Sequence, residues 1–446
     1  MSIFQENFGR NVITLVTGTA FAQAIVFAAT PILTRIYTPD DYGVFAVYMA
    51  VVSILAALSS GRYELATMLP VKDKDAINIL ALSVLLSTTM SIILFVIVII
   101  FNKEIATYLG NEKISTWLYL MPISVFCMGM YQSFNYWNNR KKQYLKISQS
   151  KVMQSSSTVT SNIYLGLEKS FSAGGGLITG GLVGQAIATV FLGLTIAKKD
   201  STLLNDINRK KILILGKKYK KFPIYDLPAY TAFTMYSNMA VIFFNKFFNP
   251  SVAGFYFLAN RLMQAPITLF SKSFSDVFYQ KLSQRPSNEI ISKELNYYSL
   301  KIAKLSMAPF LIIVYTSSLY VEFIFGQEWK DLYKYIVIFS IPSFFKLWLS
   351  PYGHILKTIN RQEISMYSHM LRLVLMAGYL ASYFYIEYEI LWFLFIYAIL
   401  ESSIHILMVW FVDKVVSNQE LYKVSVYRIS ALSILGLVNF QIIFGV

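Results

Sequence analysis

The sequence predicts an all-α polytopic membrane protein with about twelve transmembrane helices, arranged as two pseudo-symmetric six-helix lobes. Three observations support this: the composition, the number of apolar runs, and a motif that recurs in the second half. Of the 446 residues, 56% are hydrophobic and only 14% are charged, whereas soluble domains carry roughly 25% charged residues. A water-soluble enzyme is therefore nearly excluded, and twelve spans of about 20 residues would account for a little over half of the chain.

Apolar runs bounded by charged residues define the expected helices. They lie at residues 11–34, 42–61, 76–101, 114–137, 147–167, 174–197, 224–245, 252–280, 299–325, 332–353, 363–386 and 389–412. A further apolar run at 429–446 contains Asn439 and Gln441, so we treat it as a candidate thirteenth segment. The first run is not followed by a small-residue cleavage site, and we expect it to be a retained helix.

Lys and Arg are distributed unevenly between the two expected sides of the membrane. With the N-terminus in the cytoplasm, the inner segments hold 27 of the 39 basic residues and the outer loops hold 7. Cytoplasmic loops accumulate Lys and Arg, so this orientation is the expected one. The same asymmetry explains the formal net charge of +15 without a nucleic-acid partner. Tryptophans such as Trp137 and Trp329 fall near expected helix ends, where we expect them at the membrane interface.

The longest and most basic loop divides the chain into its expected domains. These are an N-terminal six-helix lobe at 1–197, a basic cytoplasmic linker at 198–223, a C-terminal six-helix lobe at 224–414 and a C-terminal tail at 415–446. The two halves share a motif, because residues 35–39 and Gly43 match residues 246–250 and Gly254 at a constant offset of 211. The match indicates duplication, and its Pro suits the first turn of a helix. Parallel repeats of this kind are associated with alternating-access transporters.

Three stretches of the sequence carry a resemblance to a known family. They are Thr34-Arg35-Ile36-Tyr37-Thr38-Pro39-Asp40-Asp41-Tyr42-Gly43 leading to Arg62-Tyr63-Glu64; Ala253-Gly254-Phe255-Tyr256 with Asn260-Arg261; and Phe325-Gly326-Gln327-Glu328-Trp329 followed by Ser350-Pro351 and Arg361-Gln362. Each is weak singly, but as a set across residues 30–365 they are specific. The chain resembles the polysaccharide flippases, or O-antigen translocases, of the multidrug, oligosaccharidyl-lipid and polysaccharide exporter superfamily.

The resemblance implies that the two six-helix lobes enclose a central cavity, and that the chain performs transport rather than enzymatic chemistry. The implied cargo is an undecaprenyl-diphosphate-linked oligosaccharide repeat unit, an O-antigen or capsule precursor. It would move from the inner to the outer leaflet of the bacterial cytoplasmic (inner) membrane by alternating access. Membrane lipids and this polyprenyl-diphosphate-linked oligosaccharide are the expected partners, and the choice between a proton, a sodium ion and no coupling ion stays open. No cofactor is expected.

The diphosphate of the implied cargo calls for positive side chains at membrane depth. An ionised side chain within a span is costly and is by default a functional candidate. Counted inward from the expected helix ends, Arg261, Lys346 and Arg372 lie nearest the midplane, and we expect them to bind the substrate. Lys272 is a secondary candidate because it and Lys151 lie close enough to the cytoplasmic face to snorkel there.

The expected eighth helix carries a polar face. Arg261, Thr268, Lys272 and Asp276 recur at spacings that place them on one side of the helix. One interpretation is a cavity wall that engages the diphosphate and sugar hydroxyls, with Asp276 pairing to Lys272. The alternative is a ladder of ion pairs between helices.

Arg62 lies at the inner end of the second expected helix and is a further candidate for capturing the diphosphate. The alternative is a structural anchor. Because helix residues two apart do not face each other, we expect Arg62 and Glu64 each to pair with another element.

Glu401 and His405 lie one helical turn apart and could share a proton, so together with Asp276 they are the candidates for ion coupling. The alternative is a hydrogen-bonded packing pair. Gly176, Gly180 and Gly184 are not followed by the Lys of a phosphate loop, and their spacing predicts close helix packing instead.

No metal site is expected. His354 and His369 have no second ligand at metal spacing, and Cys127 is the single cysteine.

Two other functions compete with the flippase interpretation. A multidrug or organic-cation extruder of the same superfamily should prefer acidic cavity residues, whereas the midplane charges here are mostly basic and only Glu401 opposes them. A membrane glycan polymerase should carry a sizeable outer loop or a His/Asp/Glu cluster, and the outer loops here are all short.

Overall fold

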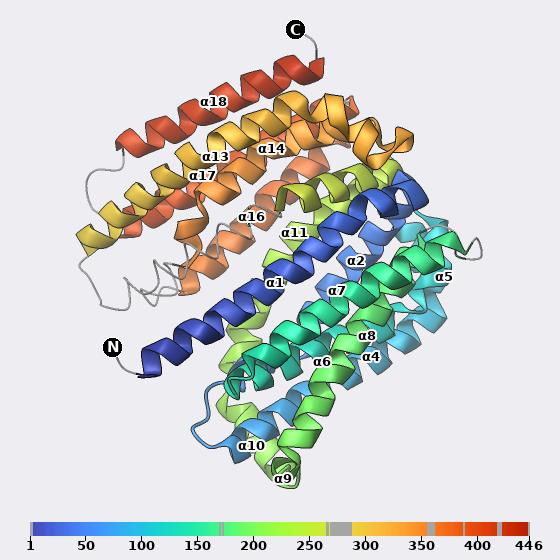
Figure 1. Ribbon diagram of the computed structural model, residues 1–446, viewed down its shortest axis with the longest axis vertical. Helices are drawn as coiled ribbons and strands as arrows, with labels where there is room; N and C mark the ends of the chain where they lie inside the picture. The colour runs from blue at the N-terminus through green and yellow to red at the C-terminus, as the bar shows by residue number, and fades with distance from the viewer. Residues whose placement is uncertain are drawn as a thin grey trace. The chain divides into compact units, whose positions relative to one another are not determined.

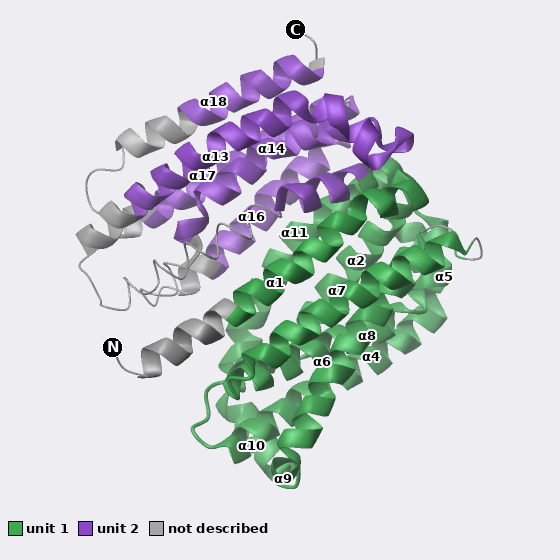
Figure 2. Ribbon diagram, viewed as in Figure 1, with its two compact units in different colours: residues 1–254 green, residues 255–446 purple. Residues whose placement is uncertain are grey.

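Every regular element in the computed structural model is a helix (Figure 1). The structure describes residues 3–168, 171, 174–264, 267, 288–354, 362–386, 389–416 and 422–444. These residues form two compact units, 1–254 and 255–446 (Figure 2). The expectation of an all-α fold is confirmed for the described part of the chain.

Unit 1 contains the helices of the first half and the first helix of the second half. Its α-helices are α1 (Ile3–Ile36), α2 (Pro39–Ser59), α3 (Tyr63–Ala66), α4 (Asp73–Tyr108), α5 (Ser115–Leu118), α6 (Met121–Arg140), α7 (Tyr144–Leu167), α8 (Gly175–Lys199), α9 (Ser201–Leu204), α10 (Arg209–Lys218) and α11 (Leu227–Phe247). A 3-10 turn, η1 (Glu112–Ile114), follows α4, and a π-helical turn, η2 (Phe222–Asp226), precedes α11. Within the unit α7 packs against α1 and α8, and α11 packs against α2 (Figure 1).

Unit 2 contains the remaining long helices. They are α13 (Asn288–Phe325), α14 (Leu332–Trp348), α16 (Gln362–Ser382), α17 (Ile390–Val416) and α18 (Tyr422–Phe444), with the 3-10 turns η3 (Gln327–Trp329) and η4 (Ser350–His354). Residues 250–264 form a further helix that starts in unit 1 and continues into unit 2. In unit 2, α13, α17 and α18 pack against α14.

Six of the described helices are long and apolar enough to cross a membrane, and a seventh span results if a bent pair is counted as one. The six are found at Thr14–Ile36, Pro39–Ser59, Asp73–Tyr108, Gly175–Lys199, Tyr297–Phe325 and Ile390–Val412, and the bent pair joins Glu112–Leu118 to Met121–Arg140 at 56°. With these spans, the chain is a multi-pass membrane protein. The expected third helix extends to Tyr108 rather than ending at residue 101, because the backbone leaves helical geometry only at Phe101 (φ −113°) and then resumes it.

The recurring proline starts a helix in both halves, as predicted. At α2, Thr38 Oγ1 accepts a hydrogen bond from the Asp41 backbone N–H at 3.2 Å, and the Asp41 carboxylate accepts one from the Thr38 backbone N–H at 3.0 Å. This capping box satisfies otherwise unpaired N–H groups, with Pro39 in the first turn. At the equivalent position Asn249 Oδ1 accepts from the Val252 backbone N–H at 2.9 Å, and the helix begins at residue 250.

The glycines of α8 form a packing ridge, as predicted. A methyl group added at Gly180 would lie 2.0 Å from Asn162 Oδ1, and one added at Gly184 would lie 2.0 Å from Thr158 Oγ1, both on α7. The two helices therefore approach closely because these positions carry no side chain.

The basic segment after α8 folds into short helices rather than a loop. Within α10, Leu215 is buried in a small cluster with Ala66 of α3 and Ile79 of α4. The basic residues Arg209, Lys210 and Lys211 stay exposed, so α10 docks through Leu215 and leaves these charges on the surface.

Two of the tryptophans near expected helix ends are buried within the protein, and their expected place at the membrane interface stays a prediction. Trp137 and Trp329 are both fully buried. The indole N–H of Trp137 donates to Asp200 Oδ2 at 2.9 Å, and Lys141 joins the same carboxylate at 3.2 Å. A buried indole is favourable once its N–H has a partner, and the sequence does not reveal that partner.

The candidate thirteenth segment is a helix, α18, and its polar residue anchors it to α14. The Asn439 side chain is fully buried, and its Nδ2 donates to the Val337 carbonyl at 2.7 Å and to Ser340 Oγ at 3.1 Å. Interhelical hydrogen bonds of this kind hold membrane helices together. The Asn that made the segment doubtful as a span is therefore the residue that attaches it.

Replacing Asn439 with Leu should lower the free energy of unfolding by about 1–2 kcal/mol, because both hydrogen bonds to α14 are lost. Thermal unfolding of the purified protein in detergent measures the change. Gln441 is exposed on the same helix, and Gln441→Leu should leave the unfolding temperature almost unchanged. Equal effects of the two substitutions would contradict the anchoring role of Asn439.

Candidate functional site

The centre of the candidate site in unit 2 is an ion pair between α14 and α17. Lys346 Nζ lies 2.7 Å from Glu401 Oε1, and the side chains are 23% and 5% exposed. Two of the charges singled out in the sequence therefore meet, although one was a candidate for substrate binding and the other for ion coupling. A buried pair of this kind is stable only while both partners are present.

His405 and Arg372 extend this cluster. His405 Nδ1 lies 2.7 Å from the backbone carbonyl of Glu401, and the positive charges of Lys346 and Arg372 both act on the imidazole. The Glu401 carboxylate itself binds Lys346, so the contact of His405 with Glu401 runs through the main chain. Arg372, on α16, and His405 are both half-buried.

Aromatic and amide side chains complete the cluster. The Tyr256 hydroxyl hydrogen-bonds with Asn260 and Tyr397, and Tyr256 interacts electrostatically with Glu401. The Tyr256 ring lies edge-on to Phe339 of α14, with 4.7 Å between the ring centroids. Sequence reasoning did not select Tyr256 or Asn260. The available signal was their place in the motif that ends at Arg261.

Arg261 lies in the same helix, one residue after Asn260, and is half-buried. The other members of the expected polar face, Thr268, Lys272 and Asp276, lie outside the described residues, so their pairing stays a prediction. Lys151, the other residue considered for snorkelling, donates from Nζ to Thr19 Oγ1 of α1 at 3.0 Å.

The second group of candidate residues lies in unit 1, around Arg62. Arg62 Nη1 contacts Glu64 Oε1 at 3.1 Å, and its Nε contacts Asp226 Oδ2 at 2.7 Å. Its guanidinium carbon also lies 3.9 Å from the centroid of the Tyr230 ring. Burial alone would lower the pKa of Arg62, but the Glu64 and Asp226 carboxylates outweigh it and raise that pKa. These contacts favour the anchoring interpretation of Arg62.

The expectation that Arg62 and Glu64 would not meet is wrong. Arg62 has a left-handed backbone (φ +63°) and precedes α3, so helix spacing does not apply to the pair. The expectation that Arg62 pairs with another element is confirmed by Asp226 in η2. Glu64 is fully buried and also accepts a hydrogen bond from Ser60 Oγ.

The two copies of the repeated motif contact each other, and the contact is reciprocal. A methyl group added at Gly43 would lie 2.0 Å from the carbonyl oxygen of Pro250, and one added at Gly254 would lie 2.0 Å from the carbonyl oxygen of Pro39. Ser251 Oγ also hydrogen-bonds to Asp40, its equivalent in the first copy. If the two copies are exchanged, the Gly43–Pro250 contact becomes the Gly254–Pro39 contact. This reciprocity is expected when two duplicated motifs are related by a two-fold axis.

Among the described residues, no group of three or more His, Cys, Asp or Glu side chains could hold a metal ion. The candidate site is therefore built from ion pairs, amides and aromatic rings.

Comparison with known proteins adds a family and a fold. The sequence pattern of a family described as "Polysaccharide biosynthesis protein" matches residues 32–334. A search of curated proteins finds no match. Among solved structures, an inward-facing multidrug resistance MATE family transporter of the MOP superfamily has a TM-score of 0.67 at 14% identity, covering 95% of this chain and 99% of that chain.

Two further structures share the fold. The lipid II flippase MurJ, in an inward closed conformation, has a TM-score of 0.67 at 12% identity and covers 97% of this chain and 99% of that chain. A MOP superfamily transporter from Pyrococcus furiosus, whose binding pocket is described as reversed in polarity, has a TM-score of 0.61 at 14% identity, with 95% and 96% covered. The fold is therefore that of the twelve-helix transporters of this superfamily.

Proposed function

Because the chain belongs to the polysaccharide biosynthesis protein family, we propose that it is a flippase for polyprenyl-diphosphate-linked oligosaccharides. The family confirms the resemblance inferred from residues 30–365. The proposed cargo is an undecaprenyl-diphosphate-linked repeat unit, an O-antigen or capsule precursor, carried from the inner to the outer leaflet of the bacterial cytoplasmic membrane. The proposed orientation places the N-terminus in the cytoplasm, since the basic segments then lie inside.

The observation that carries this proposal is the charge of the described part of the cluster in unit 2. Among the described residues, Lys346 pairs with Glu401, and both Lys346 and Arg372 act electrostatically on His405. An excess of positive charge among apolar helices favours an anionic ligand, and the cargo presents a diphosphate. Arg and Lys are the side chains that bind phosphate groups, Arg in a bidentate manner.

A proton provides a way to free Lys346 for the cargo. While Glu401 is ionised, it holds Lys346 in the ion pair; once Glu401 takes up a proton, its attraction for the ammonium weakens and Lys346 can engage the diphosphate. His405 Nδ1 lies against the backbone carbonyl of Glu401, while the Glu401 carboxylate binds Lys346. In this mechanism Glu401 carries the proton, while Arg372 and Arg261 are further candidates for contacting the diphosphate.

Replacing Glu401 with Gln should therefore remove the dependence of transport on an imposed pH gradient, because Gln resembles the protonated acid and cannot titrate. Proteoliposomes with and without a gradient measure this. If the variant kept its dependence on the pH gradient, Glu401 would not be the coupling residue. That result would not contradict the proposal that the protein flips the cargo.

The organic-cation extruder is the second candidate, since MATE transporters share the fold. The excess of positive charge around Glu401 disfavours a cationic ligand. The Pyrococcus furiosus transporter of the same fold is described as having a pocket of reversed polarity that suggests a different function. The same criterion, applied to this cluster, favours an anionic cargo over a cationic drug.

Flipping is tested with purified protein in proteoliposomes that contain an undecaprenyl-diphosphate-linked oligosaccharide. Periodate, which does not cross the bilayer, should oxidise only the sugars that face outward, so flipping appears as the loss of a protected fraction. Wild-type protein should expose that fraction and Arg372→Gln should not. Lys334→Gln is the matched control, because Lys334 pairs with Asp331 in a partly exposed ion pair away from the cluster.

Two outcomes would contradict the proposal. One is protection that persists with the wild-type protein, and the other is export of a cationic dye with no movement of the oligosaccharide. In cells, deletion of the gene should leave completed lipid-linked units on the cytoplasmic leaflet.

A further inference from the structure

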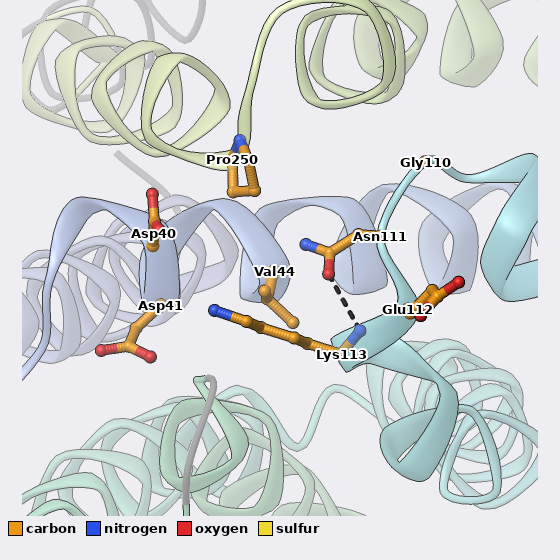
Figure 3. A pocket seen from close by; sticks show the side chains of 8 residues that line it. All are labelled: Asp40, Asp41, Val44, Gly110, Asn111, Glu112, Lys113 and Pro250. Carbon is orange, nitrogen blue, oxygen red and sulfur yellow. Dashed lines mark hydrogen bonds between the residues drawn. The ribbon is translucent and has the colours of Figure 1, made fainter.

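A pocket of about 320 Å³ lies in unit 1, where the start of α2 meets the turn after α4 and the start of the helix at 250–264 (Figure 3). Its walls include Asp40, Asp41, Val44, Asn111, Lys113 and Pro250. The volume is at the lower end of the range for small-molecule sites, which suits one or two sugar rings. In the proposed orientation, this end of the helices lies on the outer side of the membrane.

Asn111 is the residue that indicates a missing ligand. It is only 8% exposed, and its Oδ1 accepts a hydrogen bond from the Lys113 backbone N–H at 3.0 Å. Its Nδ2 is buried and has no hydrogen-bond partner. The amide nitrogen points into the pocket, toward the space between Val44 and Pro250 (Figure 3). A buried N–H group without an acceptor costs about 1–3 kcal/mol, so an acceptor on a bound ligand would relieve that cost.

The opposite wall supplies acceptors. Asp40 is exposed, and one of its oxygens accepts from Ser251 Oγ. Asp41 uses Oδ2 in the capping box of α2. Carboxylates on one wall and an amide N–H on the other can together bind hydroxyl groups, which both donate and accept.

The floor of the pocket is apolar. Val44 is buried and Pro250 is half-buried, and both border the space that the Asn111 amide faces. A pyranose ring presents hydroxyls at its edge and C–H groups on its face. Apolar contact for the face, with polar groups around the rim, matches that distribution.

The charges of the residues that line the pocket disfavour the diphosphate end of the cargo. The lining contains three acidic residues, Asp40, Asp41 and Glu112, and one basic residue, Lys113. This balance repels a phosphate or diphosphate group. A metal ion is not the occupant either, because the described residues hold no group of three or more acidic, His or Cys ligands.

We propose that this pocket binds an uncharged sugar ring, the sugar end of the lipid-linked oligosaccharide, as the cargo reaches the outer side. The proposal rests on the proposed flippase function. It separates two recognition tasks within one chain: basic residues of unit 2 engage the diphosphate, and the acidic pocket of unit 1 engages the neutral sugar. Because Asp40 and Pro250 come from the two copies of the repeated motif, an occupant contacts both copies at once.

The test is protection of a cysteine at the rim of the pocket. Cys127 is the single cysteine of the chain and is buried, so Cys127→Ser provides a cysteine-free background for Glu112→Cys. Glu112 lines the pocket and its side chain is exposed, so a thiol there should react with a membrane-impermeant maleimide unless an occupant shields it. The probes are the methyl glycosides of glucose, galactose, mannose and N-acetylglucosamine, with sodium diphosphate as the anionic comparison.

At least one methyl glycoside should slow the labelling of the full-length protein in lipid nanodiscs, and diphosphate should not. Asn111→Leu and Asp40→Asn should each raise the glycoside concentration needed for protection by about tenfold, the equivalent of one lost hydrogen bond to a charged or buried group. Asp40 is exposed, so its substitution does not threaten folding. Glu104→Gln makes the same carboxylate-to-amide change on an exposed residue of α4 and should leave protection unchanged.

Three outcomes overturn the proposal: no protection by any glycoside, equal protection in Asn111→Leu and Asp40→Asn, or protection by diphosphate alone. The flipping assay is independent of this one. If the wild-type protein flips the oligosaccharide but the labelling shows no protection, the pocket proposal fails while the flippase stands. If labelling is protected but nothing is flipped, the flippase proposal fails and a sugar site remains.

Discussion

Replacing Lys346 with Met is expected to lower the free energy of unfolding by about 3–5 kcal/mol and to abolish transport, because it leaves a buried carboxylate without its counter-ion. Lys346 is the ion-pair partner of Glu401 at 2.7 Å, and the Glu401 side chain is only 5% exposed. Without its lysine, the carboxylate keeps the cost of desolvation and loses its counter-ion. Unfolding of the purified protein in detergent measures the stability, and periodate protection in proteoliposomes measures the transport.

A double variant separates the structural role of Lys346 from its role in transport. In Lys346→Met with Glu401→Gln both charges are gone, so most of the lost stability should return. Transport should not return, because the diphosphate has lost one of its cations. A double variant that is both stable and active would contradict the substrate role of Lys346 and leave it as a structural partner of Glu401.

Lys334→Met serves as the control for the removal of a lysine from an ion pair. Lys334 pairs with Asp331 at 2.9 Å, but the side chains are 31% and 44% exposed. Surface pairs contribute about 0–1 kcal/mol, so this variant should unfold close to the wild type. A loss as large as that of Lys346→Met would mean that burial does not explain the difference.

The fold class could be predicted from the sequence because each membrane span needs a long run of apolar residues, and such runs are visible in the sequence itself. Six of the expected apolar runs form helices that are long and apolar enough to span a membrane, Pro39 and Pro250 begin helices, and the glycines of α8 pack against α7. Each of these signals acts within one helix or between neighbours in sequence. Asn439 was harder to interpret. A polar side chain in an apolar run argues against a span until its partner is known, and that partner, Val337, lies in a different helix.

The candidate site could be predicted only as a set of residue types. The midplane charges identified Lys346, Arg372 and Glu401, but periodicity does not say which helices pack together, so the Lys346–Glu401 pair was not foreseen. At Arg62 helix spacing gave a wrong expectation, since a left-handed residue lies where a helix was assumed. The sequence contains 31 tyrosines and gives no reason to single out Tyr256. Only its contacts with Asn260 and Tyr397 distinguish it.

Substituting Ala for Gly43 or for Gly254 should be as damaging as the loss of the buried ion pair. The added methyl at Gly43 would lie 2.0 Å from the oxygen and 2.9 Å from the Cα of Pro250, and the methyl at Gly254 would lie 2.0 Å from the oxygen of Pro39 and 3.0 Å from the Gly43 nitrogen. These are backbone atoms, which cannot move aside as a flexible side chain can. Overpacking typically costs about 1–3 kcal/mol and more where the backbone must shift, so we expect a loss of about 3 kcal/mol from either variant.

The reciprocity of this contact makes a sharper prediction for the double variant. Gly43 and Gly254 lie on one interface, so once the first methyl has separated the two copies, the second should cost much less than it does alone. Gly181→Ala is the matched control in the same unit, because its methyl would meet only Phe45, at 3.8 Å; Ala is also the better helix former there, and stability should hold or rise slightly. Thermal unfolding of the wild type, the two single variants, the double variant and the Gly181→Ala control measures these losses. If the losses of stability from the Gly43 and Gly254 substitutions were strictly additive, the two glycines would not share an interface. That result would contradict the two-fold relation between the repeats.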